Sequence, residues 1–148
     1  MSNNLTQNEI EKLLNMLKYS LESEIMFPIT QGKRTKFEVI GDEKQNKFSI
    51  IIFRGRIHKI KYNIVAQIYN GNILLMELHI GSDLVHTNPD GEKIIGNHWH
   101  IFSEKYGRAY AFSAENIDSE KFVENTILFL DKFNVIQKPQ VYYQEELF

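Results

Sequence analysis

Hydrophobic residues near the start of the chain recur every three to four positions, which is the spacing of one face of a helix. Thr6 and Glu9 precede them as a capping box, in which each side chain satisfies an unpaired backbone N–H group of the first turn. This pattern predicts an amphipathic helix of roughly four turns. We interpret its apolar face as a contact with the core. That face is formed by Ile10, Leu13, Leu14, Leu17 and Leu21.

A second helix is predicted from about residue 119 to 133, because apolar residues again recur at helical spacing there. Asp118 is the expected N-cap, and Asn134 suits the position just after the last turn, where a left-handed conformation is common. Pro139 stops further helix, and we expect Val141-Tyr142-Tyr143 to add a short strand or to cover the core.

Between the helices the hydrophobic period changes to two, which is typical of strands. Asn70-Gly71 predicts a two-residue type I′ hairpin, which would pair Tyr62 with His79 and Ile64 with Glu77. Strand 73–80 is apolar on both faces over most of its length, so we place it at the centre of the sheet. The predicted fold is α+β, with a mostly antiparallel sheet of about five to seven strands and an N-terminal and a C-terminal helix packed on one face.

Composition narrows the class of protein. The chain has 148 residues, 43% of them hydrophobic and 24% charged, which predicts one globular domain over residues 1–148. Without cysteine it forms no disulfide, thiolate nucleophile or Cys-based zinc site. It lacks a signal-peptide pattern and any apolar run of about 18 residues, so we expect a cytoplasmic protein with no membrane contact. The net charge of −2 gives no general attraction to nucleic acid, so RNA binding would need a local basic patch.

The stretch 86–100 holds three of the five histidines and the only tryptophan. Pro89-Asp90-Gly91 predicts a three-residue hairpin loop that sets Asn88 opposite Glu92 and His86 opposite Ile94. Side chains alternate along a strand, so His86, Ile94, His98 and His100 are expected to share one face, above a floor of Leu78, Ile80 and Leu84. A bulge at Gly96-Asn97 would move His98 and His100 together to the other face, which leaves their relation to His86 open. Trp99 points the opposite way, and we expect it to pack in the core.

Two kinds of chemistry suit these histidines. Three imidazoles with an open fourth position are a ligand set of zinc hydrolases. Without a metal, one neutral imidazole can take a proton from a 2′-hydroxyl while a protonated one donates to the leaving oxygen. The second reaction also needs donors that hold the phosphate, and the candidates are Arg54, Arg56 and Arg108, with Tyr106 as an extra donor. In the alternative without chemistry, the histidines are half-buried strand residues bonded to their neighbours.

The chain also shows a family resemblance. The residues that show it are Arg54-Gly55-Arg56, His86-x-Asn88-Pro89-Asp90-Gly91-Glu92, His98-x-His100 and Tyr106-Gly107. Together they resemble an uncharacterised family of small bacterial proteins that are often found in prophages and other mobile elements, and the resemblance covers roughly residues 5 to 148. It implies a setting among toxins, phage-defence or anti-defence proteins, and it assigns no role to any residue.

We therefore expect an RNA-directed protein of toxin or mobile-element type that acts as a metal-independent endoribonuclease without a cofactor. His86, His98, His100 and Tyr106 would carry the catalysis, and Arg54, Arg56 and Arg108 would bind the phosphate. The alternative is a non-catalytic inhibitor, antitoxin-like or anti-defence protein, including an anti-CRISPR-like one, that binds a host, phage or cognate protein. Its acidic tail, 144–148, could mimic nucleic-acid charge. The oligomeric state stays open.

Overall fold

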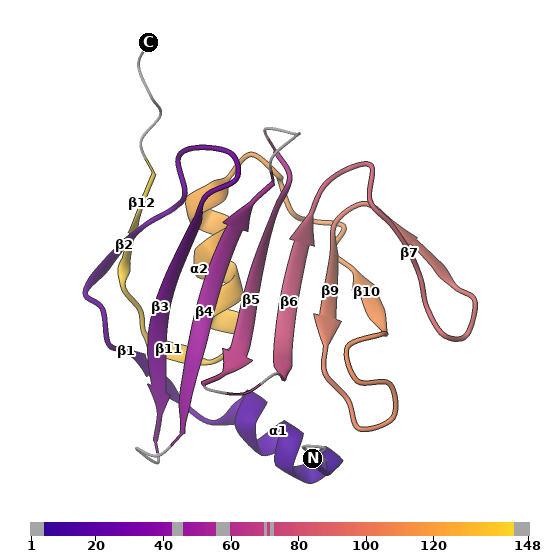
Figure 1. Ribbon diagram of the computed structural model, residues 1–148, viewed down its shortest axis with the longest axis horizontal. Helices are drawn as coiled ribbons and strands as arrows, with labels where there is room; N and C mark the ends of the chain where they lie inside the picture. The colour runs from indigo at the N-terminus through magenta and orange to yellow at the C-terminus, as the bar shows by residue number, and fades with distance from the viewer. Residues whose placement is uncertain (1–4, 43–45, 56–59, 70, 72, 144–148) are drawn as a thin grey trace.

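The computed structural model describes residues 5–42, 46–55, 60–69, 71 and 73–143. Its centre is an eight-stranded sheet with the strand order β10-β9-β6-β5-β4-β3-β1-β11 (Figure 1). The elements in chain order are α1 Gln7–Asn15, β1 Lys18–Ser20, β2 Glu24–Met26, β3 Arg34–Gly41, β4 Lys47–Arg54, β5 Tyr62–Ile68, β6 Leu74–Ile80, β7 Val85–Thr87, β8 Lys93–Ile95, β9 His98–Ile101, β10 Ala111–Ser113, α2 Phe122–Lys132, β11 Val135–Gln137 and β12 Gln140–Tyr142.

The strands confirm an α+β fold with a mostly antiparallel sheet. Strands β1 and β11 pair in parallel at one end of the sheet, and β2 and β12 form a separate parallel pair. The predicted number of strands, five to seven, is wrong, because the main sheet has eight. The strands that the pattern does not predict are β1 and β11, each three residues long, and three residues hold too little alternation to show a period of two.

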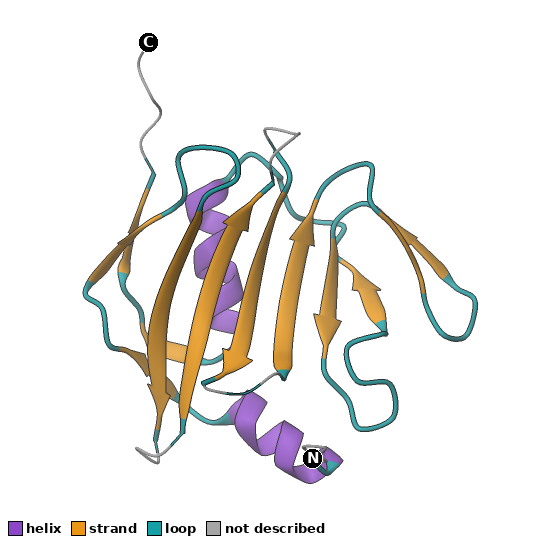
Figure 2. Ribbon diagram, viewed as in Figure 1, coloured by secondary structure: helices purple, strands orange, loops and turns teal. Residues whose placement is uncertain are grey.

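The core lies between the sheet and α2, which runs behind the strands in Figure 2. Phe129 of α2 stacks on Trp99 at a centroid distance of 6.1 Å, and Phe133, just after the helix, meets the Phe48 ring edge-on at 5.4 Å. Trp99 is thus a core residue, as the sequence predicts. Burial of each large apolar side chain of this kind stabilises the fold by about 1.5–3 kcal/mol. Because these side chains pack against α2, the opposite face of the sheet points away from the helix.

Helix α1 is shorter than predicted. Its capping box is confirmed: the Glu9 amide donates to Thr6 Oγ1 at 3.1 Å, and the Thr6 amide donates to Glu9 Oε1 at 2.9 Å. The helix ends at Asn15 because Met16 is extended and Lys18 already begins β1. In Figure 1, α1 lies across the ends of the central strands, so the expectation that it shares a sheet face with α2 is not confirmed.

Helix α2 begins later than predicted. Its first residue is Phe122, and its N-cap position is taken by Lys121, which makes no side-chain capping bond. The Asp118 carboxylate instead accepts a hydrogen bond from the Glu120 amide at 3.1 Å, so it caps the turn that precedes the helix. Asn134 has a φ of 61° and ends α2 in the left-handed conformation that its position predicts.

The pairing of β5 with β6 differs by one residue from the prediction. Tyr62 lies opposite Ile80 and Ile64 opposite Leu78, because the register shifts between Ala66 and Gln67. Asn70, on which the predicted register rests, lies outside the described residues. A shift of one residue exchanges the two faces of a strand, so Glu77 and His79 lie on the face away from α2.

Candidate metal centre

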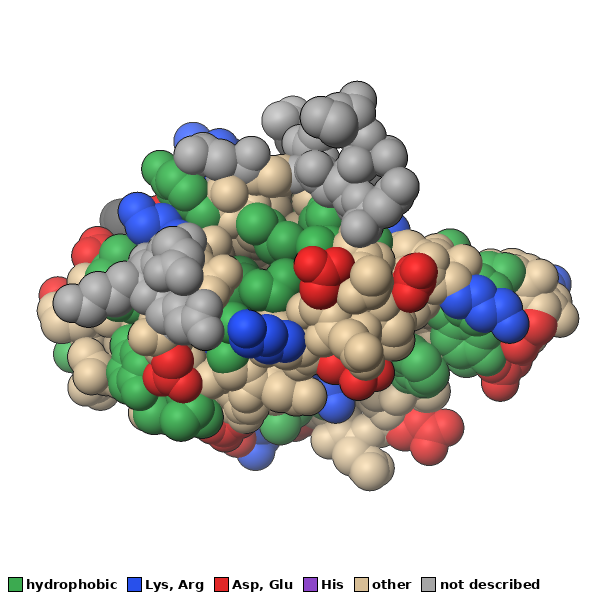
Figure 3. All heavy atoms as spheres, turned by 90° about the horizontal axis from the view of Figure 1, so that it is seen from below, with side chains coloured by type: hydrophobic (Ala, Val, Ile, Leu, Met, Phe, Trp, Pro, Cys, Tyr) green, Lys and Arg blue, Asp and Glu red, His purple; other side chains and the backbone are tan. Residues whose placement is uncertain are grey.

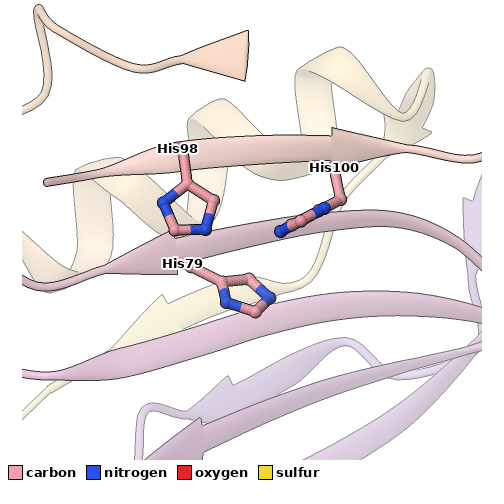
Figure 4. Close-up of side chains that lie close together, drawn as sticks. All are labelled: His79, His98 and His100. Carbon is pink, nitrogen blue, oxygen red and sulfur yellow. The ribbon is translucent and has the colours of Figure 1, made fainter. Parts of the chain in front are cut away.

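Three histidines meet on the sheet face away from α2. Strand β9 carries His98 and His100, and the neighbouring β6 carries His79, which lies directly opposite His98. The three rings point toward one another in Figure 4, and their centroids are 4.9–5.0 Å apart. One ring nitrogen from each lies within 4.8 Å of one in each of the others. Imidazole nitrogens that converge in this way can hold a metal ion.

The two histidines of β9 are each fixed by a backbone carbonyl. Nδ1 of His98 is 2.8 Å from the Gly96 oxygen, and Nδ1 of His100 is 2.7 Å from the Arg108 oxygen. A carbonyl only accepts, so the proton is assigned to Nδ1 of both rings. Nε2 of each ring then keeps a lone pair, which is the form in which histidine ligates metals.

Burial keeps these two rings neutral. It lowers the pKa of His100 to about 4, helped by the charge of His79, and burial is also the main cause that lowers the pKa of His98. Both side chains are buried, with small exposed fractions of 3% for His98 and 6% for His100. At neutral pH the pair therefore suits metal ligation, whereas a general acid would have to be protonated.

His79 has a carboxylate partner. Its Nε2 lies 2.9 Å from Glu77 Oε1, so this nitrogen donates and Nδ1 keeps the lone pair. Glu77 also accepts from Arg108, with 2.8 Å from Nε to Oε2 and 2.6 Å from Nη2 to Oε1. Burial alone raises the pKa of the Glu77 carboxyl, but the bonds from His79 and Arg108 hold it below its usual value. Glu77 is therefore an ionised anchor for both partners.

His86 reaches the cluster from the hairpin of β7 and β8. Its predicted partner is confirmed, since His86 pairs with Ile94, and the Asn88 amide bonds to the Glu92 oxygen at 2.8 Å. The His86 ring lies 4.8 Å from that of His100 and 5.8 Å from that of His98 by centroid. Its Nε2 is 2.7 Å from the Ala109 oxygen. The structure thus brings all three predicted histidines together, although His86 is outside the group of closest ring nitrogens.

Asn88 holds this hairpin against the edge strand β10. Its Oδ1 accepts from the Ala111 amide at 2.7 Å, and its Nδ2 donates to the Ala111 oxygen at 3.0 Å. The side chain is buried, and its amide group bonds to the backbone N–H and C=O of Ala111 as a neighbouring strand would. Asn88 therefore determines where His86 lies. The sequence pattern explained it only as a turn residue.

The predicted floor of the histidine face is wrong. Leu78 pairs with Trp99, and Ile80 pairs with Tyr62, so both belong to the face that α2 covers. His100 lies opposite Glu77, where the prediction had Ile80. The cause is the pairing of β6 with β9, whose register differs from the expected one by an odd number of residues and so brings Glu77 and His79, instead of Leu78 and Ile80, to the histidine face.

The other predicted residues divide between two parts of the molecule. Arg108 belongs to the histidine cluster, whereas Arg54 lies on the α2 face, where Nη1 donates to the Pro28 and Ile29 oxygens at 3.0 Å. Tyr106 lies in the turn after β9, with its ring 5.3 Å from that of Tyr110. Arg56 is outside the described residues.

The sequence pattern did not indicate His79 and Glu77 as site residues. The expected pairing set His100 opposite Ile80, which left Glu77 and His79 on the other face, whereas His79 lies opposite His98. The available signal was a pair of matching spacings: Glu77-x-His79 on one strand and His98-x-His100 on another. Two such pairs on adjacent strands form a square of side chains.

Neither helix in the described parts of the chain is long and apolar enough to cross a membrane. Comparison with curated proteins and with solved structures finds no match. A family model of unknown function does match residues 5–135, which confirms an uncharacterised family at that level; the motif and the prophage setting stay predictions. The chain therefore belongs to DUF6978, a family of unknown function.

Proposed function

We propose that this protein is a metal-dependent hydrolase whose divalent ion is held by His79, His98 and His100. The observation that carries the proposal is the convergence of three ring nitrogens within 4.8 Å, from two adjacent strands. Nitrogen ligands suit zinc and its first-row neighbours rather than magnesium or calcium. Three protein ligands leave a fourth position for water, as in catalytic zinc sites.

The spacing of the rings is compatible with an ion. Zinc–nitrogen bonds of about 2.0–2.1 Å in a tetrahedral site place the ligand nitrogens roughly 3.4 Å apart. The ring nitrogens lie within 4.8 Å of one another, so shifts of about 1 Å or less per ring bring them to bonding distance. Rotation about the side-chain torsions of two neighbouring strands supplies such shifts without moving the backbone.

Each proposed ligand already has a second hydrogen bond that orients it. His98 and His100 use the Gly96 and Arg108 carbonyls, and His79 uses the Glu77 carboxylate. Carbonyl and carboxylate partners of this kind are found behind metal-ligating histidines, where they fix the ring and its tautomer. Such bonds also satisfy buried N–H groups in a cluster without a metal, so the convergence of the ring nitrogens carries the proposal.

A bound divalent ion would lower the pKa of its water to about 7 and so supply a nucleophile at neutral pH. His86 lies beside His100 but outside the ligand group, which suits it to exchange a proton with that water. Arg108 and Glu77 fix the wall of the site next to His79.

The metal-independent ribonuclease stays a prediction with less support. It needs a protonated histidine as general acid, yet burial lowers the pKa values of His98 and His100. It also needs phosphate-binding cations at the histidines, and of Arg54 and Arg108 only Arg108 is there. In the view of Figure 3, basic and acidic side chains are mixed rather than gathered by sign. RNA as substrate, the cytoplasmic location and the mobile-element setting remain expectations.

The protein-binding alternative also stays a prediction. It rests on the absence of a recognisable catalytic motif and on the acidic tail, 144–148, which lies outside the described residues. The burial of His98 and His100 is compatible with it, because a binding protein needs no exposed histidines.

Metal titration tests the proposal. Protein stripped with a chelator is titrated calorimetrically with Zn²⁺, Co²⁺ and Mg²⁺, and we expect one tight site for zinc and cobalt and none for magnesium. His98→Gln and His100→Gln should each abolish the tight site, while His86→Gln should retain it. Tight binding that survives the His98→Gln/His100→Gln double substitution would contradict the proposal. Cleavage of RNA in excess chelator would instead support the metal-independent alternative.

A further inference from the structure

The charges around the three histidines leave a bound ion uncompensated. His98 and His100 would ligate through Nε2 as uncharged imidazoles, since Nδ1 of each ring donates to a backbone carbonyl, and the Glu77 carboxylate is already paired with the Arg108 guanidinium. Metal-site electrostatics is dominated by the ion itself. A divalent ion at this site therefore keeps nearly its full positive charge, and the fourth position favours a negatively charged ligand.

Arg108 is fixed beside His79 and His100 by two parts of the residue. Its backbone oxygen accepts from His100 Nδ1, and its side chain donates through Nε and Nη2 to Glu77. Nη2 of Arg108 and Nε2 of His79 bond to the same oxygen, Glu77 Oε1, so the guanidinium lies within two hydrogen-bond lengths of the His79 ring.

The guanidinium still has donors to offer. Arg108 bonds through Nε and Nη2, and among the described residues nothing is bonded to Nη1. The side chain is 56% exposed although its carboxylate partner is only 1% exposed. One edge of the planar group is thus fixed by Glu77, while the other edge is open to solvent and to a ligand.

We infer that the ligand of this centre is a phosphoryl group, which the ion and Arg108 hold together. This inference rests on the proposed function, because it requires the ion. A phosphoryl group directs oxygens to several sides, so one can bind the ion while another accepts from Nη1. A carboxylate has two oxygens in one plane and cannot fill both positions as well. Arginine is also the residue whose fork of donors matches phosphate geometry.

The test uses zinc-loaded protein freed of excess metal by gel filtration, with its zinc content measured first. Calorimetric titration with inorganic phosphate should show binding at one site per zinc, and acetate at equal concentration should bind at least about tenfold more weakly. Arg108→Gln should weaken phosphate binding per bound zinc roughly 10- to 100-fold, with the zinc content of the variant measured in the same sample. Arg34→Gln, a change of an exposed arginine on β3, should alter neither.

Arg108→Lys keeps the charge and serves if Arg108→Gln does not fold; it should lose part of the phosphate affinity because lysine lacks the planar fork. A mononucleotide and a short single-stranded RNA form two further arms, and tighter binding of either than of inorganic phosphate identifies the source of the phosphoryl group. Equal affinity for acetate and phosphate, or phosphate binding unaffected by both Arg108 variants, would overturn the inference. If the unaltered protein does not bind zinc, the proposed metal site itself is refuted, which is a different result.

Discussion

His79 lies directly opposite His98 across the pairing of β6 with β9, on the sheet face away from α2. The same register sets Glu77 opposite His100, so the four side chains form a square of three imidazoles and one carboxylate. Two neighbouring strands of a sheet hold side chains at nearly fixed separations. The candidate site is therefore built on two paired strands and not on loops, which is where a metal site needs its ligands.

Glu77→Gln should weaken zinc binding about 10- to 100-fold, because the substitution removes the charged partner that orients the His79 ring. Calorimetric titration of the stripped variant measures the effect. Glu38→Gln, at a half-buried position of β3 away from the histidines, is the matched control and should bind zinc as the unaltered protein does. Equal zinc affinity of Glu77→Gln and Glu38→Gln would show that Glu77 is not a partner of a metal ligand.

The metal-free protein should lose stability as the pH falls from about 6.5 to 4. Burial lowers the pKa values of His98 and His100, the latter to about 4, so the folded state binds fewer protons than the unfolded chain in this window. The free energy of unfolding therefore decreases as the pH falls, by an amount on the order of 2 kcal/mol. Urea unfolding at several pH values measures this loss. His100→Gln should flatten the curve, and an unchanged slope would contradict the assignment.

Zinc binding at pH 7.5 should release few protons from His98 and His100, because both rings are already neutral there. Calorimetric titrations in buffers of different ionisation enthalpy count the released protons. The buffer dependence of the apparent binding enthalpy at pH 7.5 should correspond to no more than about one released proton, that of the water bound to the ion. The enthalpy should depend on the buffer more strongly near pH 4.5, where metal and proton compete for the rings. Two or more protons released at pH 7.5 would contradict neutral ligands.

Lys18→Met tests a second buried charge, away from the histidines. Lys18 Nζ donates to the Leu14, Met16 and Phe133 oxygens at 2.8–3.0 Å and lies 3.9 Å from the Phe133 ring centre. The substitution leaves three carbonyls without this donor, so it should cost about 1–3 kcal/mol at pH 7.

Burial lowers the pKa of Lys18 to about 7, although the charge of Asp42 opposes this. Between about pH 7 and 10 the unfolded chain binds a proton that the folded state has released, so the free energy of unfolding should rise with pH in the unaltered protein. The Lys18→Met variant should lack this rise, and the exposed control Lys36→Met should keep it. Parallel curves for Lys18→Met and the unaltered protein would show that Lys18 stays charged.

Asn88→Ala should release the β7–β8 hairpin from β10, because it removes two buried hydrogen bonds with Ala111. We expect a cost of about 2 kcal/mol and faster hydrogen exchange at the Ala111 amide. Zinc affinity should change little, since the three ligands lie on β6 and β9. Slow exchange at Ala111 in the variant would mean that the hairpin is held by other contacts.

The features that sequence reasoning predicted correctly depend on short spacing. The capping box of α1, the pairing of His86 with Ile94 and the core position of Trp99 follow from residues within a few positions of one another. Alternation along one strand likewise placed His98 and His100 on one side. None of these predictions requires knowing how strands that are distant in the sequence pair.

The pairing of distant strands could not be predicted in the same way. The register shift between Ala66 and Gln67 carries no glycine or other visible signal, and it exchanges the faces of all residues beyond it in β6. The pairing of β6 with β9 was also expected in another register, with His100 opposite Ile80 instead of Glu77, so His79 and Glu77 fell outside the histidine face, which left no carboxylate partner and favoured metal-free chemistry. Arg54 was grouped with the histidines by charge alone, whereas the fold sets it on the opposite face.

X-ray absorption spectroscopy of the zinc-loaded protein tests the central claim most directly, because it reports the atoms bound to the ion. The account predicts a four-coordinate site with three imidazole nitrogens at about 2.0–2.1 Å and one further light atom. The His79→Gln/His98→Gln/His100→Gln triple variant should show no such site. A spectrum without imidazole scattering, or the same spectrum from the triple variant, would contradict a metal centre at these three histidines.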